Sequence, residues 1–208
     1  MSKYLIGSAL MQWTSGNYFI IVAGVLLGPV SVGALRASSN IIGITNILLQ
    51  GLENIAPQSA SKHLISSGIF GLNFYLKKIF LLGGSAILLI VSILILFSSE
   101  ILVTLYGDDY SQYSYILVWY SIISFIVFSL TPLFIGLRTL ENTKPIFISY
   151  LISTIFSVFA ANFLIKEFEV NGVMFGILTN NLIMVFISYK SFLKTCRIQL
   201  ENDNNILK

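Results

Sequence analysis

The chain has 208 residues, of which 56% are hydrophobic and only 10% are charged, and its mean hydropathy is +0.86. Soluble domains carry about 25% charged residues because their surfaces face water, so this composition excludes a water-soluble globular enzyme. The sixteen phenylalanines and ten tyrosines exclude a disordered chain, which is poor in aromatic residues. The composition therefore predicts an all-α integral membrane protein with several spans.

The first apolar run begins directly after Met1 to Lys3 and continues to Leu35. It is longer than the apolar core of a signal peptide, which has about 7–15 residues, and it lacks a convincing small-residue cleavage site. We therefore expect an uncleaved first span. The single cysteine, Cys196, has no partner for an internal disulfide or a metal site.

Uncharged stretches separated by charged residues predict six membrane-spanning helices, since one span needs about 20 residues. The predicted spans cover residues 4–28, 33–57, 79–97, 113–137, 145–165 and 170–189. They form one membrane domain over 1–190, and a polar cytoplasmic tail follows over 191–208. Gly28-Pro29 marks a turn after the first span, because proline lacks the amide donor that a continuing helix uses.

The basic residues predict the orientation. With the N-terminus in the cytoplasm, only Arg36 and Lys166 fall outside. The basic residues on the cytoplasmic side are then Lys3, Lys62, Lys77, Lys78, Arg138, Lys144, Lys190, Lys194, Arg197 and Lys208. This asymmetry is a strong positive-inside bias, so we expect a multi-pass protein with both termini in the cytoplasm.

Two connections between the predicted spans are longer than the rest. Residues 62–78 have apolar side chains at helical spacing beside Lys77-Lys78, so this link is either an amphipathic helix at the headgroups or an extension of the two flanking spans. Residues 98–112 contain Gly107-Asp108-Asp109, a turn signal on the outer side. Two adjacent carboxylates without further ligands are typical of a solvated turn rather than a calcium site.

No motif of a soluble enzyme is present, and we expect no enzymatic activity, cofactor or metal. The sequence has no glycine-rich phosphate loop, no His/Cys metal pair and no nucleophile with a plausible base. His63, the only histidine, adjoins Lys62 in a predicted loop, where a solvated side chain is the simpler interpretation. The net charge of +3 follows from the topological bias and does not indicate a nucleic-acid-binding patch.

The second predicted span has a stripe of polar or small residues along one side. The stripe consists of Arg36, Asn40, Gly43, Asn46, Gln50, Glu53 and Pro57, joined by Asn54. At about 100° per residue, the alternating steps of three and four place these positions within an arc of roughly 140°. Such a face cannot look at lipid, so it faces other helices or a water-filled cavity.

Two interpretations of the stripe remain open. In the first, the amides form hydrogen bonds between helices, and each bond stabilises the helix packing by about 0.6–2 kcal/mol. As a cavity wall, the stripe solvates a hydrophilic substrate, and its length, with a charge at each end, favours this second interpretation. The candidate cavity residues are Arg36, Asn40, Asn46, Gln50 and Glu53. No Asp, Glu, Lys or Arg lies near the middle of any predicted span, which argues against a buried carboxylate relay for protons within this chain.

Other small and polar residues inside the predicted spans favour contacts between helices. Gly83-Gly84 and the G-x-x-x-G pair Gly172 and Gly176 mark places where helices approach closely. Single amides are most often interhelical contacts, and the candidates are Gln12, Asn17, Asn162, Asn180 and Asn181.

Several of these segments resemble one protein family. The stretch Leu27 to Ala37, LGPVSVGALRA, with the polar helix after it and the exit Ile55-Ala56-Pro57, resembles the "LGP-x-x-VGALRA" hairpin of Wzx-type polysaccharide flippases of the MATE-like superfamily. Leu105 to Tyr110 is similar to the Tyr-Gly-x-x-Tyr loop of these proteins. Val170 to Gly176 is similar to their late span with two glycines.

The resemblance implies a fold and a function. Members of this family have 12 to 14 helices in two six-helix lobes, and the chain looks like one lobe, most like the second. The implied function is transport of a lipid-linked oligosaccharide of O-antigen or capsule type across the bacterial inner membrane. A second copy or a separately encoded lobe would be the partner, and Arg36 would contact the diphosphate on the release side. The alternatives are a non-transporting membrane subunit or a truncated, inactive remnant.

Overall fold

The structure, a computed structural model, describes the backbone of residues 2–206 and the side chains of residues 11–201. Almost all of these residues are helical, which confirms the all-α prediction. The elements are α1 (Ser2–Leu27), α2 (Pro29–Leu96), α3 (Ser98–Tyr106), the 3-10 helix η1 (Asp108–Tyr113), α4 (Ser114–Thr139) and α5 (Lys144–Ile206). Met1 and the last two residues of the predicted tail lie outside the described residues.

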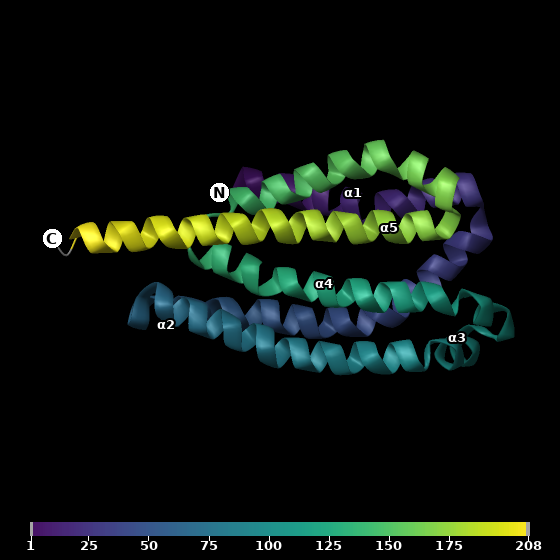
Figure 1. Ribbon diagram of the computed structural model, residues 1–208, viewed down its shortest axis with the longest axis horizontal. Helices are drawn as coiled ribbons and strands as arrows, with labels where there is room; N and C mark the ends of the chain where they lie inside the picture. The colour runs from purple at the N-terminus through teal and green to yellow at the C-terminus, as the bar shows by residue number, and fades with distance from the viewer. Residues whose placement is uncertain (1, 207–208) are drawn as a thin grey trace.

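The two longest helices are each interrupted by a sharp break. In α2 the break lies at Ser67 and Gly68, where Gly68 has a φ of 60°, a conformation that glycine adopts at little cost. In α5 it lies at Glu169, with a φ of 50°. Figure 1 shows the ribbon turning back at both places. The breaks divide α2 into 29–66 and 69–96, and α5 into 144–168 and 170–206.

These bounds resolve one alternative and add detail at two of the predicted limits. The link over 62–78 is not a separate interfacial helix, because helix 29–66 runs through its first half and helix 69–96 through its second. The helix that contains the second predicted span begins at Pro29, before the predicted start at residue 33. Gly28 takes a φ of 84° there, and proline fits the first helical turn. Residues 191–201 continue α5 as a helix, with Arg197 and Glu201 paired at 3.1 Å one turn apart.

Within the part of the chain that the structure describes, three helical stretches are long and apolar enough to cross a membrane, which supports the prediction of a membrane protein. They are Pro29–Leu96, Asp108–Thr139 and Lys144–Glu201. At 1.5 Å per residue, the first and third are more than about twice as long as the ~30 Å hydrocarbon layer is thick. Each of these two therefore has enough length on either side of its break for a separate crossing.

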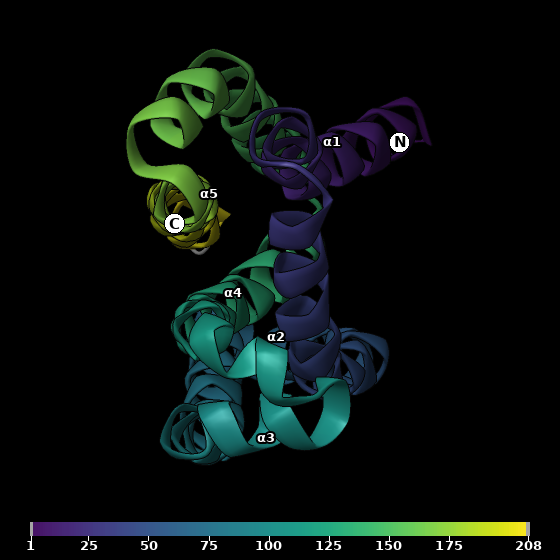
Figure 2. The same cartoon turned by 90° about the vertical axis from the view of Figure 1, so that its right-hand side faces the viewer.

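The helices pack in two groups. Figure 2 shows α1 with α5 in one group and α2 with α3 and α4 in the other, while the beginning of α2 and the packing of α4 against α5 connect them. Glycines permit close approach within both groups, as predicted. A Cβ at Gly83 would lie 2.8 Å from the ring of Phe128, and one at Gly176 would overlap the ring of Phe19, which is fully buried.

The connections alternate between the two ends of the bundle. The start of α1 and the end of α5 lie at one end, together with the break at 67–68 and the link at 140–143 (Figure 1). Gly28, residues 97–113 and the break at Glu169 lie at the other. The final turns of α5 project beyond the rest of the bundle at the first end (Figure 1).

Candidate functional site

The polar stripe lies on the exposed side of helix 29–66. Its charged and amide side chains, Arg36, Asn40, Asn46, Gln50, Glu53 and Asn54, are all exposed, and Gly43 and Pro57 are half-buried. The opposite side of the same helix is buried and includes Leu35, Ile42, Thr45, Leu49 and Ala56. The stripe therefore points away from the core of this chain.

Among the described side chains, only those at the two ends of the stripe make polar contacts with other helices. Arg36 donates a hydrogen bond from Nη2 to Oδ1 of Asn17 on α1, at 3.3 Å. Glu53 Oε2 lies 4.0 Å from Nη1 of Arg138, in the last turn of α4. Between these ends, the amides of Asn40, Asn46 and Gln50 make no hydrogen bond with any other described residue.

This exposure decides part of the question that the sequence left open. If the stripe held helices of this chain together, the amides between its ends would form hydrogen bonds with neighbouring helices, and they form none with the described residues. The stripe is left to face water or a partner outside this chain. Sequence reasoning could not separate these cases, because helical periodicity shows that residues share a face but not which face is buried.

Arg138 is a member of this surface that sequence reasoning missed. It counted only as one of the cytoplasmic basic residues, and it is far from Glu53 in the sequence. The packing of α4 along α2 brings the two together, and each of their side chains is 43% exposed. The stripe thus has a cation at each end, Arg36 and Arg138, with a carboxylate beside the second.

An apolar edge adjoins the stripe on the same exposed side of the helix. Ile44, Leu48 and Ile55 are exposed by 58%, 44% and 70%. At about 100° per residue they fall on one line beside the stripe. The exposed side of helix 29–66 is therefore mixed: these three aliphatic side chains lie beside the stripe, and Ile47, which is 70% exposed, lies among its amides.

A second group of polar residues is buried. The amide nitrogen of Asn180 donates to Oγ of Ser157 at 2.7 Å and to the carbonyl oxygen of Ser15 at 3.4 Å. Oγ of Ser153 donates to the carbonyl oxygen of Asn180 at 3.1 Å. This Asn180 cluster joins α1 to both halves of α5, which confirms the prediction of an interhelical contact for Asn180.

The remaining predicted amides have local or solvent-facing roles. Asn181 bonds to the carbonyl oxygen of Ile177 in its own helix, at 2.8 Å, and Gln12 and Asn162 are exposed. Asp108 and Asp109 are exposed in η1. Over the part of the chain that the structure describes, no three His, Cys, Asp or Glu side chains gather in a way that could hold a metal ion.

The candidate site is therefore the surface made of the stripe, Asn17 and Arg138. It offers amide donors and acceptors for hydroxyl groups along its length, and guanidinium groups for anions at its two ends. Comparison of the chain with protein-family models, with curated proteins and with solved structures finds no match.

Proposed function

We propose that this chain is one lobe of a two-lobe transporter that moves a lipid-linked oligosaccharide across the bacterial cytoplasmic membrane. One observation carries the proposal: a line of unpaired amides lies on the outer side of a long helix in an otherwise apolar chain. Hydrocarbon cannot satisfy these groups, and each would cost several kcal/mol there. Water or a second lobe must therefore lie against them.

The proposed placement in the membrane uses six crossings. The segments are α1, 29–66, 69–96, α4, 144–168 and residues 170–189 of the last helix, and successive connections lie at alternate ends of the bundle (Figure 1). The end that holds the 67–68 break and the 140–143 link also carries Lys62, Lys77, Lys78, Arg138 and Lys144. By the positive-inside rule we place this end in the cytoplasm.

In this arrangement the stripe is one wall of a polar passage between two lobes. Its amides bond to glycan hydroxyl groups while the lipid chain stays in the bilayer. Arg138 lies at the cytoplasmic end, where an anionic diphosphate would enter, and Arg36 lies at the outer end, where it would leave. The substrate class itself comes from the sequence resemblance, and transport makes or breaks no covalent bond. A second copy or a separate chain supplies the other wall.

The experiment is complementation of a flippase-deficient strain, with surface polysaccharide as the readout. The chain is tested alone and with a co-expressed first lobe, as wild type and as Arg36→Ala, Asn46→Leu or Gln50→Leu. The matched control is Asn162→Leu, since Asn162 is also an exposed asparagine but lies outside the stripe. We expect wild type and control to restore the polysaccharide, and the three stripe variants to restore much less at equal expression.

If wild type restores nothing in either setting, transport by this chain is rejected. If the stripe variants match the control, the stripe is not part of the passage.

A second function, that of a non-transporting subunit, is favoured by the apolar edge of Ile44, Leu48 and Ile55, which suits a packed interface. Labelling of Gln50→Cys with a membrane-impermeant maleimide, in a Cys196→Ser background, separates the two. A water-filled passage leaves the new thiol reactive, whereas a packed subunit interface protects it.

A further inference from the structure

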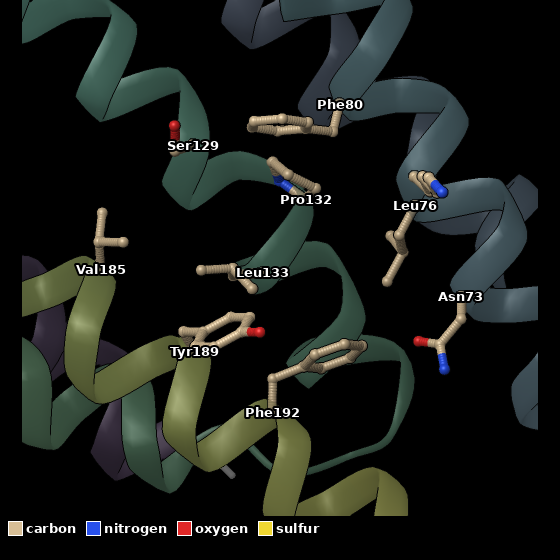
Figure 3. A pocket seen from close by; sticks show the side chains of 10 residues that line it. Asn73, Leu76, Phe80, Ser129, Pro132, Leu133, Val185, Tyr189 and Phe192 are labelled. Atoms are coloured by element: carbon tan, nitrogen blue, oxygen red, sulfur yellow. The ribbon is translucent and has the colours of Figure 1, made fainter.

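A cleft lies away from the stripe, between the two helices that follow the breaks. Its volume is about 390 Å³, within the range of about 300–1,000 Å³ for small-molecule sites. Helices 69–96 and 170–206 form its sides, and α4 lies between them (Figure 3). Six of its residues are apolar: Leu76, Phe80, Pro132, Leu133, Val185 and Phe192. No residue of the stripe lines it.

Gly136 shapes one end of this cleft. A Cβ at Gly136 would lie 2.5 Å from Cε2 of Phe192 and 2.8 Å from Cδ1 of Leu76. Because Gly136 has no side chain, Phe192 from helix 170–206 and Leu76 from helix 69–96 both pack against α4 at this position, and both are buried. Phe80 and Tyr189, at 40% and 51% exposed, leave the cleft open to the surroundings of the chain.

The polar residues of the cleft differ between its two ends. Along the direction of the helices, Phe80, Ser129 and Val185 lie at its deeper end in the proposed placement, and Asn73 lies toward the cytoplasmic end (Figure 3). Lys77 lies between Asn73 and Phe80 in helix 69–96, about one turn from each. The hydroxyl of Ser129 donates to the carbonyl oxygen of Phe125 at 3.2 Å, so the deeper end offers no free donor.

The charge of the cleft has one sign. Lys77 is exposed and is the one charged residue among those that line the cleft, so a negative group beside it meets no carboxylate. On the opposite helix, 170–206, Lys190 does not line the cleft, and its Nζ lies 4.3 Å from the centroid of the Phe186 ring. A mostly apolar cleft that is also lined by a lysine, an amide and a tyrosine complements a molecule with a hydrocarbon tail and an anionic head.

We propose that this cleft binds an anionic phospholipid of the cytoplasmic leaflet. An acyl chain lies between Phe80, Leu133 and Val185, and the headgroup phosphate pairs with Lys77. The proposal rests on the cytoplasmic placement of the 67–68 end, but not on transport of a glycan. A protein partner is less suited, since basic pockets between membrane helices on the cytoplasmic side are typical of lipid headgroup binding.

The test is native mass spectrometry of the detergent-solubilised chain with added phosphatidylglycerol or phosphatidylcholine that have the same acyl chains. We expect the wild type to retain phosphatidylglycerol in preference. Lys77→Gln should weaken that binding about fivefold, the contribution of one lysine near an anionic headgroup, and leave phosphatidylcholine binding unchanged. Lys78→Gln is the matched control, because Lys78 is also exposed but does not line this cleft.

Two further measurements test whether the acyl chain and the headgroup both contribute to binding. Val185→Phe narrows the deeper end, so it should reduce binding of both lipids, and glycerol phosphate should not displace bound lipid. Equal losses for Lys77→Gln and Lys78→Gln would overturn the proposal, as would a wild type without preference between the two lipids. Displacement by glycerol phosphate would show an anion site without a lipid chain. A failed lipid assay with intact complementation would leave the proposed transport function standing.

Discussion

The Asn180 cluster and the stripe on helix 29–66 use the same kind of side chain in opposite ways. Asn180 is 4% exposed and bonds to two neighbouring helical segments, whereas Asn46 and Gln50 are exposed and bond to no described side chain. One amide holds this chain together. The others are available to something outside it. The difference lies in the neighbours: serines of α1 and α5 contact Asn180, whereas Asn46 is exposed and has no hydrogen-bond partner among the described side chains.

The largest expected effect comes from adding a methyl group in the buried region. Gly176→Ala places a Cβ in the ring of Phe19, and we expect it to lower the free energy of unfolding by about 2–3 kcal/mol, as overpacking does. Gly43→Ala, in the stripe, meets no atom within 4 Å and should instead be neutral or stabilising. Thermal unfolding in detergent measures both, and equal effects would contradict the contrast between the two regions.

Replacement of the amides themselves should give the next largest difference. Asn180→Leu loses two hydrogen bonds between helices, so we expect a loss of about 1–2 kcal/mol. Asn46→Leu breaks no contact and should change the stability by less than about 0.5 kcal/mol. The same unfolding assay applies. A destabilised Asn46→Leu would mean that the stripe contributes to the fold of the single chain.

The ion pair at the cytoplasmic end of the stripe should matter little for stability. Glu53 and Arg138 are 4.0 Å apart and both are 43% exposed, so a double-mutant cycle of Glu53→Gln and Arg138→Gln should give a coupling energy below about 1 kcal/mol. The coupling should fall further as salt is added. A larger, salt-independent value would indicate that the pair is buried, for example beneath a second lobe.

Thiol reactivity should separate the two environments with almost no effect on stability. Burial raises the pKa of the Cys196 thiol to about 11, and this residue lies beyond the last predicted span. The thiolate is the reactive form, so Cys196 should label slowly with maleimide at neutral pH and faster as the pH rises toward that pKa. Asn46→Cys, in a Cys196→Ser background, should label fast at neutral pH. Equal rates at pH 7 would contradict the assigned burial.

Local chemistry made part of this fold predictable. Gly28-Pro29 and Gly107 both form turns with positive φ at the glycine, as their residue types indicate, and charged residues 166–169 mark the break in α5. The break at Ser67-Gly68 lay within a link that the sequence left ambiguous, because apolar residues at helical spacing continue on both sides of it.

The candidate site was predictable only as a set of residues on one helix face. Its exposure, and the pairing of Glu53 with Arg138, depend on which helices pack together. No local pattern in the sequence contains that information. The cleft at Lys77 was missed for the same reason, since its lining comes from three separate segments.

The break in α2 also constrains how the chain length can vary. Only Ser67 and Gly68 leave the helical conformation there, so the turn has almost no slack. An inserted residue that joined helix 69–96 would rotate everything before it by about 100° relative to everything after it. The number of residues at the break must therefore stay fixed if helix 69–96 is to keep Leu76, Lys77 and Phe80 beside α4. Insertions and deletions should therefore be tolerated in residues 107–112, which are mostly exposed, and rejected at 67–68.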